Sequence, residues 1–216
     1  NLSTILKSSA DFFLILSGDQ LYNINFQEII SFAKLKDADF TIASIPVSEK
    51  DARRMGLLNI DADNRVIDFI EKPQEAETLH KFELPESFFG SSRVTSYQKP
   101  LYLGSMGIYV FKREALISLF ETDQGNDFGY HLITSAVKRG STASYIYEGY
   151  WEDIGTVASY YDANLQLTHS SKGLNAYDRE NPIYARPTFL PGPKIRNTRI
   201  SQSIICEGSI IEAEEI

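Results

Sequence analysis

The clearest pattern in the chain is an unbroken apolar run, Phe12–Leu16, which predicts a strand buried on both faces of a parallel sheet. Asn25 follows at the N-cap position of a predicted amphipathic helix. The apolar positions with helical spacing are Phe26, Ile29, Ile30 and Ala33. Phe40–Ile45 is the next predicted strand. A β-α-β order of this kind predicts a parallel sheet with a right-handed crossover.

A hairpin and a further strand are predicted in the middle of the chain. Leu57–Ile60 and Val66–Ile70 flank a short polar segment, residues 61–64, and this arrangement is typical of a hairpin. Residues 74–98 are mostly polar, and we expect them to form a long excursion from the sheet. Gly107–Phe111 returns to a strand pattern. The sheet is therefore expected to gain strands on both sides of the excursion.

The chain then alternates between helix and strand patterns. Arg113–Phe120 predicts a short helix, and Tyr145–Tyr147 predicts a strand. Thr156 is the expected N-cap of a further helix, on which apolar residues mark one face. These residues are Val157, Tyr161 and Leu165.

The composition changes near residue 171, where prolines become frequent. Asn181–Pro187 and Leu190–Lys194 predict an extended linker over residues 171–198. A period of six follows, typical of a hexapeptide β-helix that begins over residues 199–216. The recurring positions are Ser203, Ser209, Ile204, Ile210, Ile216, Ile205 and Ile211. About two repeats are visible where at least three are usually needed, and a parallel sheet rarely starts with its catalytic strand, so we expect a piece truncated at both ends.

Composition and charge narrow the function classes. Hydrophobic residues make up 43% of the chain, which is enough for a sizeable core. The formal net charge of -8 argues against nucleic-acid binding and against a basic membrane surface. Cys206 is the single cysteine, so no internal disulfide forms, and we expect a reducing, cytoplasmic compartment. No apolar run reaches transmembrane length.

Two aspartates occupy positions that suit a metal-nucleotide site. Asp19 follows Ser17-Gly18 after the first predicted strand, and Asp153 follows the strand that ends in Trp151. Ligands of open α/β sheets bind outside the carboxyl ends of strands. Mg²⁺ typically takes one or two carboxylates together with water and substrate phosphates. The alternatives are an ordinary turn or capping role for Asp19 and a solvated turn role for Asp153, with Glu152 as its rival.

Three further groups of residues are candidates for substrate binding. Glu71 has the chemistry to accept hydrogen bonds from sugar hydroxyls, and Lys72 to pair with a phosphate, although a surface ion pair before Pro73 is the simpler interpretation. Gly104–Gly107 supplies the Ser105 hydroxyl and small residues that allow a ligand to approach the backbone closely. The alternative interpretation of this segment is a turn that leads into a strand. Asp127 is either a ligand or a helix N-cap.

Several other sites are excluded by the sequence. The histidines lack metal-ligand spacing, and the chain offers no Ser-His-Asp arrangement and no glycine-rich phosphate loop. The three histidines are His80, His131 and His169. A dinucleotide-binding oxidoreductase would need G-x-G-x-x-G after the first strand, where the chain has residues 17–22 instead.

Taken together, the motifs resemble the sugar nucleotidyltransferase family and, within it, the glucose-1-phosphate adenylyltransferase (ADP-glucose pyrophosphorylase) branch. The resemblance runs from Phe12 to the C-terminus. The motifs, in the family's order, are Ser17–Asp19, Glu71–Pro73, Ser105–Phe111, Asp127–Gly129 and Trp151–Thr156. Most of them are shared across sugar-1-phosphate nucleotidyltransferases. Pro182–Tyr184 with Phe189–Pro191 resembles the ADP-glucose branch specifically.

The resemblance implies an α/β fold. It consists of a Rossmann-like nucleotide-diphospho-sugar transferase domain, incomplete and with a mostly parallel sheet, over residues 1–170, and then the start of a left-handed parallel β-helix. It implies transfer of the adenylyl group of ATP to glucose 1-phosphate, with release of pyrophosphate, for glycogen or starch synthesis. Asp19 and Asp153 would hold the catalytic Mg²⁺, and Lys72 would bind the sugar phosphate. The implied substrate-binding residues are Glu71, Lys72, Ser105, Gly107, Asp127 and Trp151.

The resemblance also implies a homotetramer or heterotetramer when full length, sugar-phosphate effectors, and a cytoplasmic location, or a plastid location in a plant. The chain departs from the family in several ways. It lacks the N-terminal glycine-rich loop, so we expect this piece to be inactive alone; Gln20 stands where His is common, and Asn25 where Asp is common. A regulatory subunit, a UDP- or dTDP-sugar enzyme, and a bifunctional acyltransferase remain as alternatives.

Overall fold

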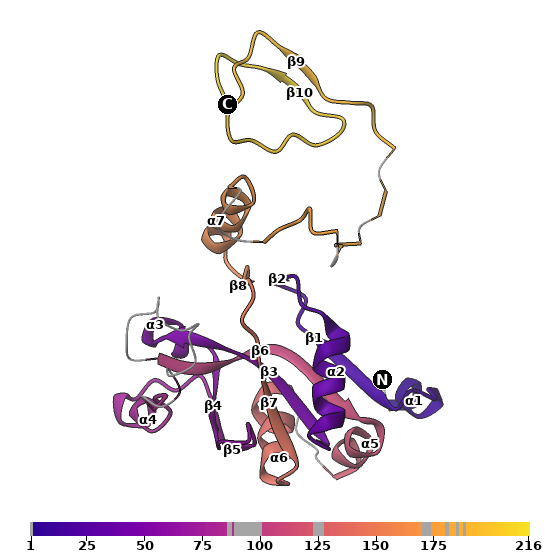
Figure 1. Ribbon diagram of the computed structural model, residues 1–216, viewed down its shortest axis with the longest axis vertical. Helices are drawn as coiled ribbons and strands as arrows, with labels where there is room; N and C mark the ends of the chain where they lie inside the picture. The colour runs from indigo at the N-terminus through magenta and orange to yellow at the C-terminus, as the bar shows by residue number, and fades with distance from the viewer. Residues whose placement is uncertain are drawn as a thin grey trace. The chain divides into compact units, whose positions relative to one another are not determined.

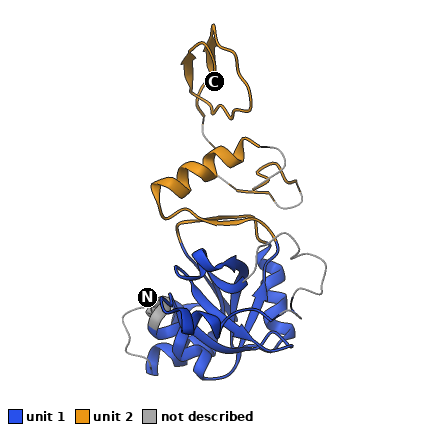
Figure 2. Cartoon of the chain, turned by 90° about the vertical axis from the view of Figure 1, so that its left-hand side faces the viewer, with its two compact units in different colours: residues 1–17, 25–148 blue, residues 18–24, 149–216 orange. Residues whose placement is uncertain are grey.

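The computed structural model describes residues 2–85, 88, 101–122, 128–169, 174–179, 182–184, 186–187 and 189–216. These residues form two compact units (Figure 2). The first unit contains residues 1–17 and 25–148, and the second contains residues 18–24 and 149–216. The chain therefore leaves the first unit briefly after its first strand and finally after residue 148.

A six-stranded sheet is the frame of the first unit (Figure 1). Its strands are β1 (Phe12–Leu16), β3 (Phe40–Ser48), β4 (Gly56–Ile60), β5 (Val66–Glu71), β6 (Leu101–Lys112) and β7 (Thr142–Ile146). The long strand β6 lies in the middle, with β3 along one edge and both β1 and β4 along the other. Strand β5 extends the sheet beyond β4, and β7 extends it beyond β3.

The prediction of a mostly parallel sheet is wrong. Both β1 and β3 pair antiparallel with β6, which lies between them. Strands β1 and β3 therefore run in the same direction but are not paired with each other. Only β3 and β7 pair in parallel within this sheet as described. Local periodicity identified each strand but carries no information about a third strand, far along the chain, that inserts between two others.

Helices cover the sheet and close its core. The helix α2 (Phe26–Leu35) buries Ile29 and Ala33 and contacts β3, β6 and β7. A separate core cluster joins Phe40, Ile42 and Phe111 of the sheet to residues of α5 (Arg113–Thr122), the π-helical segment Phe128–Ile133 and α6 (Thr134–Lys138). The rings of Phe40 and Phe111 stack with their centroids 4.2 Å apart. The described part of the unit contains three further short α-helices, α1 (Leu2–Lys7), α3 (Glu49–Ala52) and α4 (Ala76–His80).

Two local predictions for the first unit are confirmed, the Asn25 cap and the hairpin, whereas two predicted strands have other bounds: the one expected over Tyr145–Tyr147 is Thr142–Ile146, and the one expected over Gly107–Phe111 is Leu101–Lys112. The side chain of Asn25 caps α2, with its Oδ1 accepting the Gln27 N–H at 3.0 Å. The hairpin is β4–β5, and Asp61 Oδ1 organises its turn by accepting the N–H groups of Asp63 and Arg65. The polar excursion begins with α4, and residues 86–87 and 89–98 of it lie outside the described residues.

The second unit begins with a two-stranded antiparallel ribbon of β2 (Gln20–Tyr22) and β8 (Trp151–Asp153). The helix α7 (Val157–Leu167) follows, and Thr156 caps it in a capping box with Ser159, as predicted. The apolar residues that mark one face of α7 are exposed, whereas Ala163 is buried. These exposed residues are Val157, Tyr161 and Leu165.

The C-terminal segment pairs two short strands, β9 (Lys194–Arg196) and β10 (Ile210–Glu212), in parallel. A parallel bridge between Arg199 and Glu215 continues the same register. The described part of the chain shows no β-helix. The isoleucines expected to stack inward, Ile204, Ile210 and Ile216, are 47%, 80% and 44% exposed. Stacking needs further turns against which these side chains can pack.

No helix in the described ranges is both long enough and apolar enough to span a bilayer.

Candidate active site

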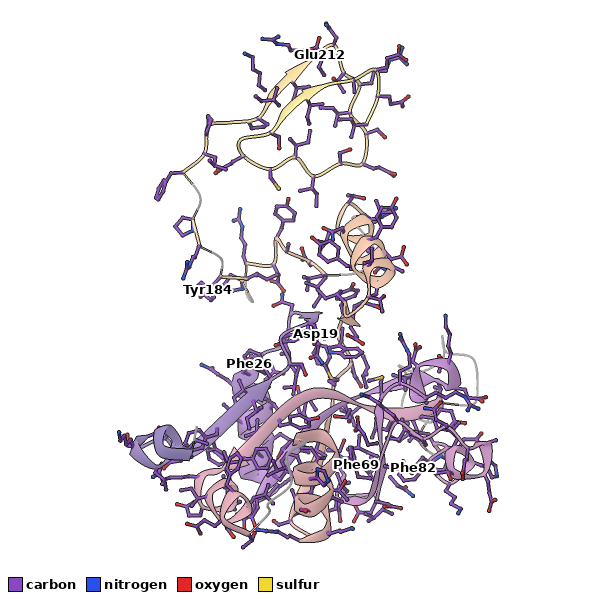
Figure 3. All side chains as sticks on the ribbon, turned by 180° about the vertical axis from the view of Figure 1, so that it is seen from behind. Asp19, Phe26, Phe69, Phe82, Tyr184 and Glu212 are labelled. Atoms are coloured by element: carbon purple, nitrogen blue, oxygen red, sulfur yellow. The ribbon has the colours of Figure 1, made fainter. Side chains whose placement is uncertain are left out.

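The β2–β8 ribbon holds the two predicted metal ligands at one of its ends. Asp19 immediately precedes β2 (Figure 3), and Asp153 is the last residue of β8. Gln20 lies directly opposite Asp153, and the Ile154 N–H donates to the Asp19 carbonyl at 3.0 Å, which extends the pairing by one step. Two segments that are distant in sequence are thus joined through their backbones at the two aspartates.

The carboxylates of Asp19 and Asp153 face a common point at Gly155. A Cβ atom built on Gly155 would lie 3.2 Å from Asp153 Oδ1 and 3.4 Å from Asp19 Oδ2. The Gly155 N–H also donates to Asp153 Oδ1 at 3.1 Å, which fixes the orientation of that carboxylate. The absence of a side chain at Gly155 therefore leaves a small space bordered by two anionic groups.

This donor set fits Mg²⁺. The ion is a hard cation that keeps several waters and is usually bound by one or two carboxylates plus substrate phosphates. Within the described residues, no cluster of three or more His, Cys, Asp or Glu side chains is arranged to hold a metal. A pair of carboxylates with room beside it matches an ion that completes its coordination with water and phosphate.

Two buried polar atoms belong to residues of the same ribbon. Trp151 Nε1 and Gln20 Oε1 are buried and have no hydrogen-bond partner among the described residues. Buried polar groups are normally satisfied, so such atoms beside a site call for an explanation such as water, an ion or a ligand. Trp151, a predicted substrate-binding residue, thus carries a buried N–H that no described residue satisfies.

The predicted phosphate-binding pair lies in the first unit, at the end of β5. Glu71 is the last residue of that strand, and Lys72 has a φ of +46°, in the left-handed region. The Lys72 ammonium lies 3.6 Å from Glu71 Oε1. The side chain of Lys72 is 62% exposed and that of Glu71 is 22% exposed. The ammonium is thus accessible to a ligand while the carboxylate is partly enclosed.

A row of side chains crosses three strands beside this pair. The strand register sets Gly56 of β4 opposite Glu71 of β5, and it sets Leu57, the next residue of β4, opposite Gly104 of β6. A Cβ on Gly56 would lie 2.8 Å from Glu71 Oε2 and 2.6 Å from the ring of Phe69, so both side chains lean over the glycine. Gly56 therefore allows the Glu71 carboxylate to extend across β4 towards β6.

Tyr109 is a residue of this site that the sequence analysis did not single out. Its hydroxyl lies 3.3 Å from Ser105 Oγ. Burial raises the pKa of Tyr109, the hydrogen bond with Ser105 opposes that rise, and the nearby Glu71 carboxylate adds to it. The signal was available, because residues four apart on a strand share a face, and Tyr109 stands four residues after Ser105 in the same motif.

Gly107 lies between these two residues with a φ of +69°, a conformation that favours glycine. Its carbonyl accepts the Ser17 N–H at 3.1 Å. Asp127, the remaining predicted substrate-binding residue, lies outside the described residues. Four predicted residues, Glu71, Lys72, Ser105 and Gly107, thus belong to the first unit. The other three, Asp19, Trp151 and Asp153, belong to the second.

Comparison with known protein families agrees with this chemistry. Residues 2–170 match the family model described as nucleotidyl transferase. The match includes both aspartates, the Glu71–Lys72 pair and the Ser105–Tyr109 strand. Members of this family typically use a nucleoside triphosphate with Mg²⁺, and a sugar phosphate accepts the nucleotidyl group. Because the match covers most of the 216 residues, the chain belongs to the nucleotidyl transferase family.

Proposed function

We propose that this protein transfers the adenylyl group of ATP to glucose 1-phosphate, giving ADP-glucose and pyrophosphate. The observation that carries the chemistry is the convergence of the Asp19 and Asp153 carboxylates on Gly155. The choice of ATP and glucose 1-phosphate is supported by the resemblance of Pro182–Tyr184 and Phe189–Pro191 to the ADP-glucose branch. The product would serve glycogen or starch synthesis.

In this reaction a phosphate oxygen of glucose 1-phosphate forms a bond to the α-phosphorus of ATP, and the bond to pyrophosphate breaks in line. The attacking phosphate is already ionised near neutral pH, so no general base is required. The protein's task is to position two polyanions and to offset their repulsion. Mg²⁺ held by Asp19 and Asp153 would supply charge neutralisation at the phosphates.

The remaining residues act on the sugar phosphate. The exposed Lys72 ammonium binds its phosphate as a compact point charge. Glu71 accepts hydrogen bonds from sugar hydroxyls, and Ser105 contributes a hydroxyl to the same pocket. Gly107 allows the sugar to approach the backbone closely. The resemblance assigns a role in sugar binding to Trp151 and Asp127 as well.

The proposed organisation follows the same resemblance. Residues 1–170 form part of the catalytic domain, residues 171–198 a linker, and residues 199–216 the start of a hexapeptide β-helix. The parallel pairing of Lys194 with Ile210 is compatible with such a start. The whole protein is proposed to be a cytoplasmic or plastid homotetramer or heterotetramer that responds to sugar-phosphate effectors.

Pyrophosphate release tests the proposal. The whole protein is incubated with Mg²⁺, glucose 1-phosphate and either ATP, UTP or dTTP, in parallel. Release with ATP alone supports adenylyl transfer. Release with UTP or dTTP in place of ATP overturns the nucleotide assignment but keeps the family chemistry. The absence of release with all three, from protein that melts cooperatively, favours a regulatory subunit.

A further inference from the structure

We propose that Gln74 is a positioning residue, which holds the backbone of Lys72 in the conformation that presents its ammonium to the sugar phosphate. The inference rests on the proposed function of Lys72 and adds to it a residue that does not touch the substrate. It starts from the φ of +46° at Lys72, which is neither glycine nor asparagine.

The unusual φ determines which way the Lys72 side chain points. In an extended strand, successive side chains lie on opposite faces of the sheet, so Glu71 and Lys72 would be separated by the backbone. The left-handed turn at Lys72 instead leaves its ammonium 3.6 Å from Glu71 Oε1. Both groups then lie close together at the strand end, as recognition of a single sugar phosphate requires.

This conformation needs external support. Residues other than glycine disfavour the left-handed region because of their Cβ atom. They persist there only when the surrounding structure holds them. The residue before a proline is further biased towards extended backbone, and Lys72 precedes Pro73. Pro73 is buried, so the chain after Lys72 is anchored while Lys72 itself is exposed.

Hydrogen bonds on both sides of Lys72 supply that support. Its N–H donates to the Met55 carbonyl at 3.1 Å. Its carbonyl accepts from Gln74 Nε2 at 2.9 Å, and the same nitrogen donates to the Arg53 carbonyl at 2.8 Å. Arg53 Nη1 returns a hydrogen bond to the Gln74 carbonyl at 2.5 Å.

The amide of Gln74 therefore ties Lys72 to the segment that leads into β4. Arg53 is itself fixed by an ion pair of 2.8 Å with Glu49 in α3. A single side chain bridges two backbone carbonyls here, and no shorter or apolar side chain has the donors to do so. We infer that loss of this amide lets Lys72 relax towards extended backbone and moves its ammonium away from the phosphate.

The test is Gln74→Met in the whole protein, assayed by pyrophosphate release at varied glucose 1-phosphate and at varied ATP. Methionine keeps the length of the side chain and removes the donors. We expect the KM for glucose 1-phosphate to rise about fivefold, the effect of one modest hydrogen bond, while the KM for ATP stays within about twofold. Gln27→Met is the matched control, because Gln27 is also exposed in the first unit and its change should alter neither constant.

Lys72→Ala separates failure of this inference from failure of the proposed function. If Lys72→Ala raises the KM for glucose 1-phosphate and Gln74→Met does not, the positioning role is wrong and the role of Lys72 stands. If Lys72→Ala leaves that KM unchanged, both are wrong. A Gln74→Met protein that only melts earlier, or in which both KM values rise together, also overturns the inference. Should Gln74→Met fold poorly, Gln74→Asn, whose amide is too short for the bridge, gives the same comparison.

Discussion

Asp19 and Asp153 approach the same side of Gly155, with Oδ2 of the first and Oδ1 of the second 3.4 Å and 3.2 Å from the position of an absent methyl group. In the proposed function, this feature turns two separate motifs into a cation site. The β2–β8 ribbon creates it, because Gln20 pairs with Asp153 and the Asp19 carbonyl accepts the Ile154 N–H. The following predictions test this site and the row of residues around Glu71.

Gly155→Ala should weaken Mg²⁺ binding. The added methyl group would enter the space that both carboxylates border, 3.4 Å from Asp19 Oδ2 and 3.2 Å from Asp153 Oδ1, of which the second distance is tighter than ordinary contact. We expect the Mg²⁺ concentration for half-maximal activity to rise about tenfold, as is typical when the surroundings of metal ligands change. Gly192→Ala is the control, since a methyl group there meets no atom within 4 Å. Equal Mg²⁺ dependence in the two variants would show that the ion does not occupy this space.

Asp153→Asn should lower kcat by about 100-fold or more, because a metal ligand that stabilises transferring phosphate is lost. The melting temperature should change little, because the Asp153 side chain is only partly buried and contributes little to a core. Glu152→Gln distinguishes the rival carboxylate and should retain most activity. Retained turnover in Asp153→Asn together with loss in Glu152→Gln would transfer the metal-binding role to Glu152.

Gly56→Ala should both destabilise the first unit and impair sugar binding. Its methyl group would lie 2.6 Å from Phe69 Cζ and 2.8 Å from Glu71 Oε2, so one of these side chains must move. Overpacking of this kind costs about 1–3 kcal/mol in the free energy of unfolding. Denaturant unfolding measures that loss, and the KM for glucose 1-phosphate reports the displacement of Glu71. If stability falls while this KM stays constant, the predicted effect of Gly56→Ala on sugar binding is wrong.

Tyr109 should contribute to the loss of stability at alkaline pH. Burial raises its pKa above the ordinary value of 10.0, with a further rise from Glu71 and an opposing effect of Ser105. In the unfolded chain the hydroxyl ionises near its ordinary pKa, while in the folded protein it stays protonated to higher pH. Above pH 10 the unfolded state then binds fewer protons than the folded state. Tyr109 therefore leaves the free energy of unfolding unchanged below pH 10 and lowers it as the pH rises above 10.

Tyr109→Phe removes that titration. The free energy of unfolding of this variant, measured in urea on both sides of the ordinary tyrosine pKa, should fall less with rising pH than that of the unaltered protein. Tyr160→Phe is a suitable control because Tyr160 is exposed, at 57%. An identical alkaline loss in the Tyr109→Phe and unaltered proteins would mean that Tyr109 ionises as freely when folded as when unfolded.

The sequence by itself determined the features that are encoded within a few neighbouring residues. The apolar run Phe12–Leu16 is a strand, Asn25 caps α2, and Thr156 caps α7, as their patterns predict. Asp61 similarly marks the β4–β5 turn. Caps, turns and periodicity depend on hydrogen bonds and side-chain spacing over one or two turns of chain, so local sequence is sufficient for them. The aspartates and the Glu71–Lys72 pair were identified in the same way, from short motifs.

Only the tertiary structure decided which of these segments meet. Strand β6 inserts between β1 and β3, and Tyr109 joins Ser105 on its surface. Gly56 makes room for Glu71 through a register between β4 and β5 that no local pattern specifies. The left-handed backbone of Lys72 depends on Met55 and Gln74, which hold it from both sides. Such features arise from pairing between distant strand edges and from contacts that outweigh local backbone preference, and their free energy exists only once the chain has folded.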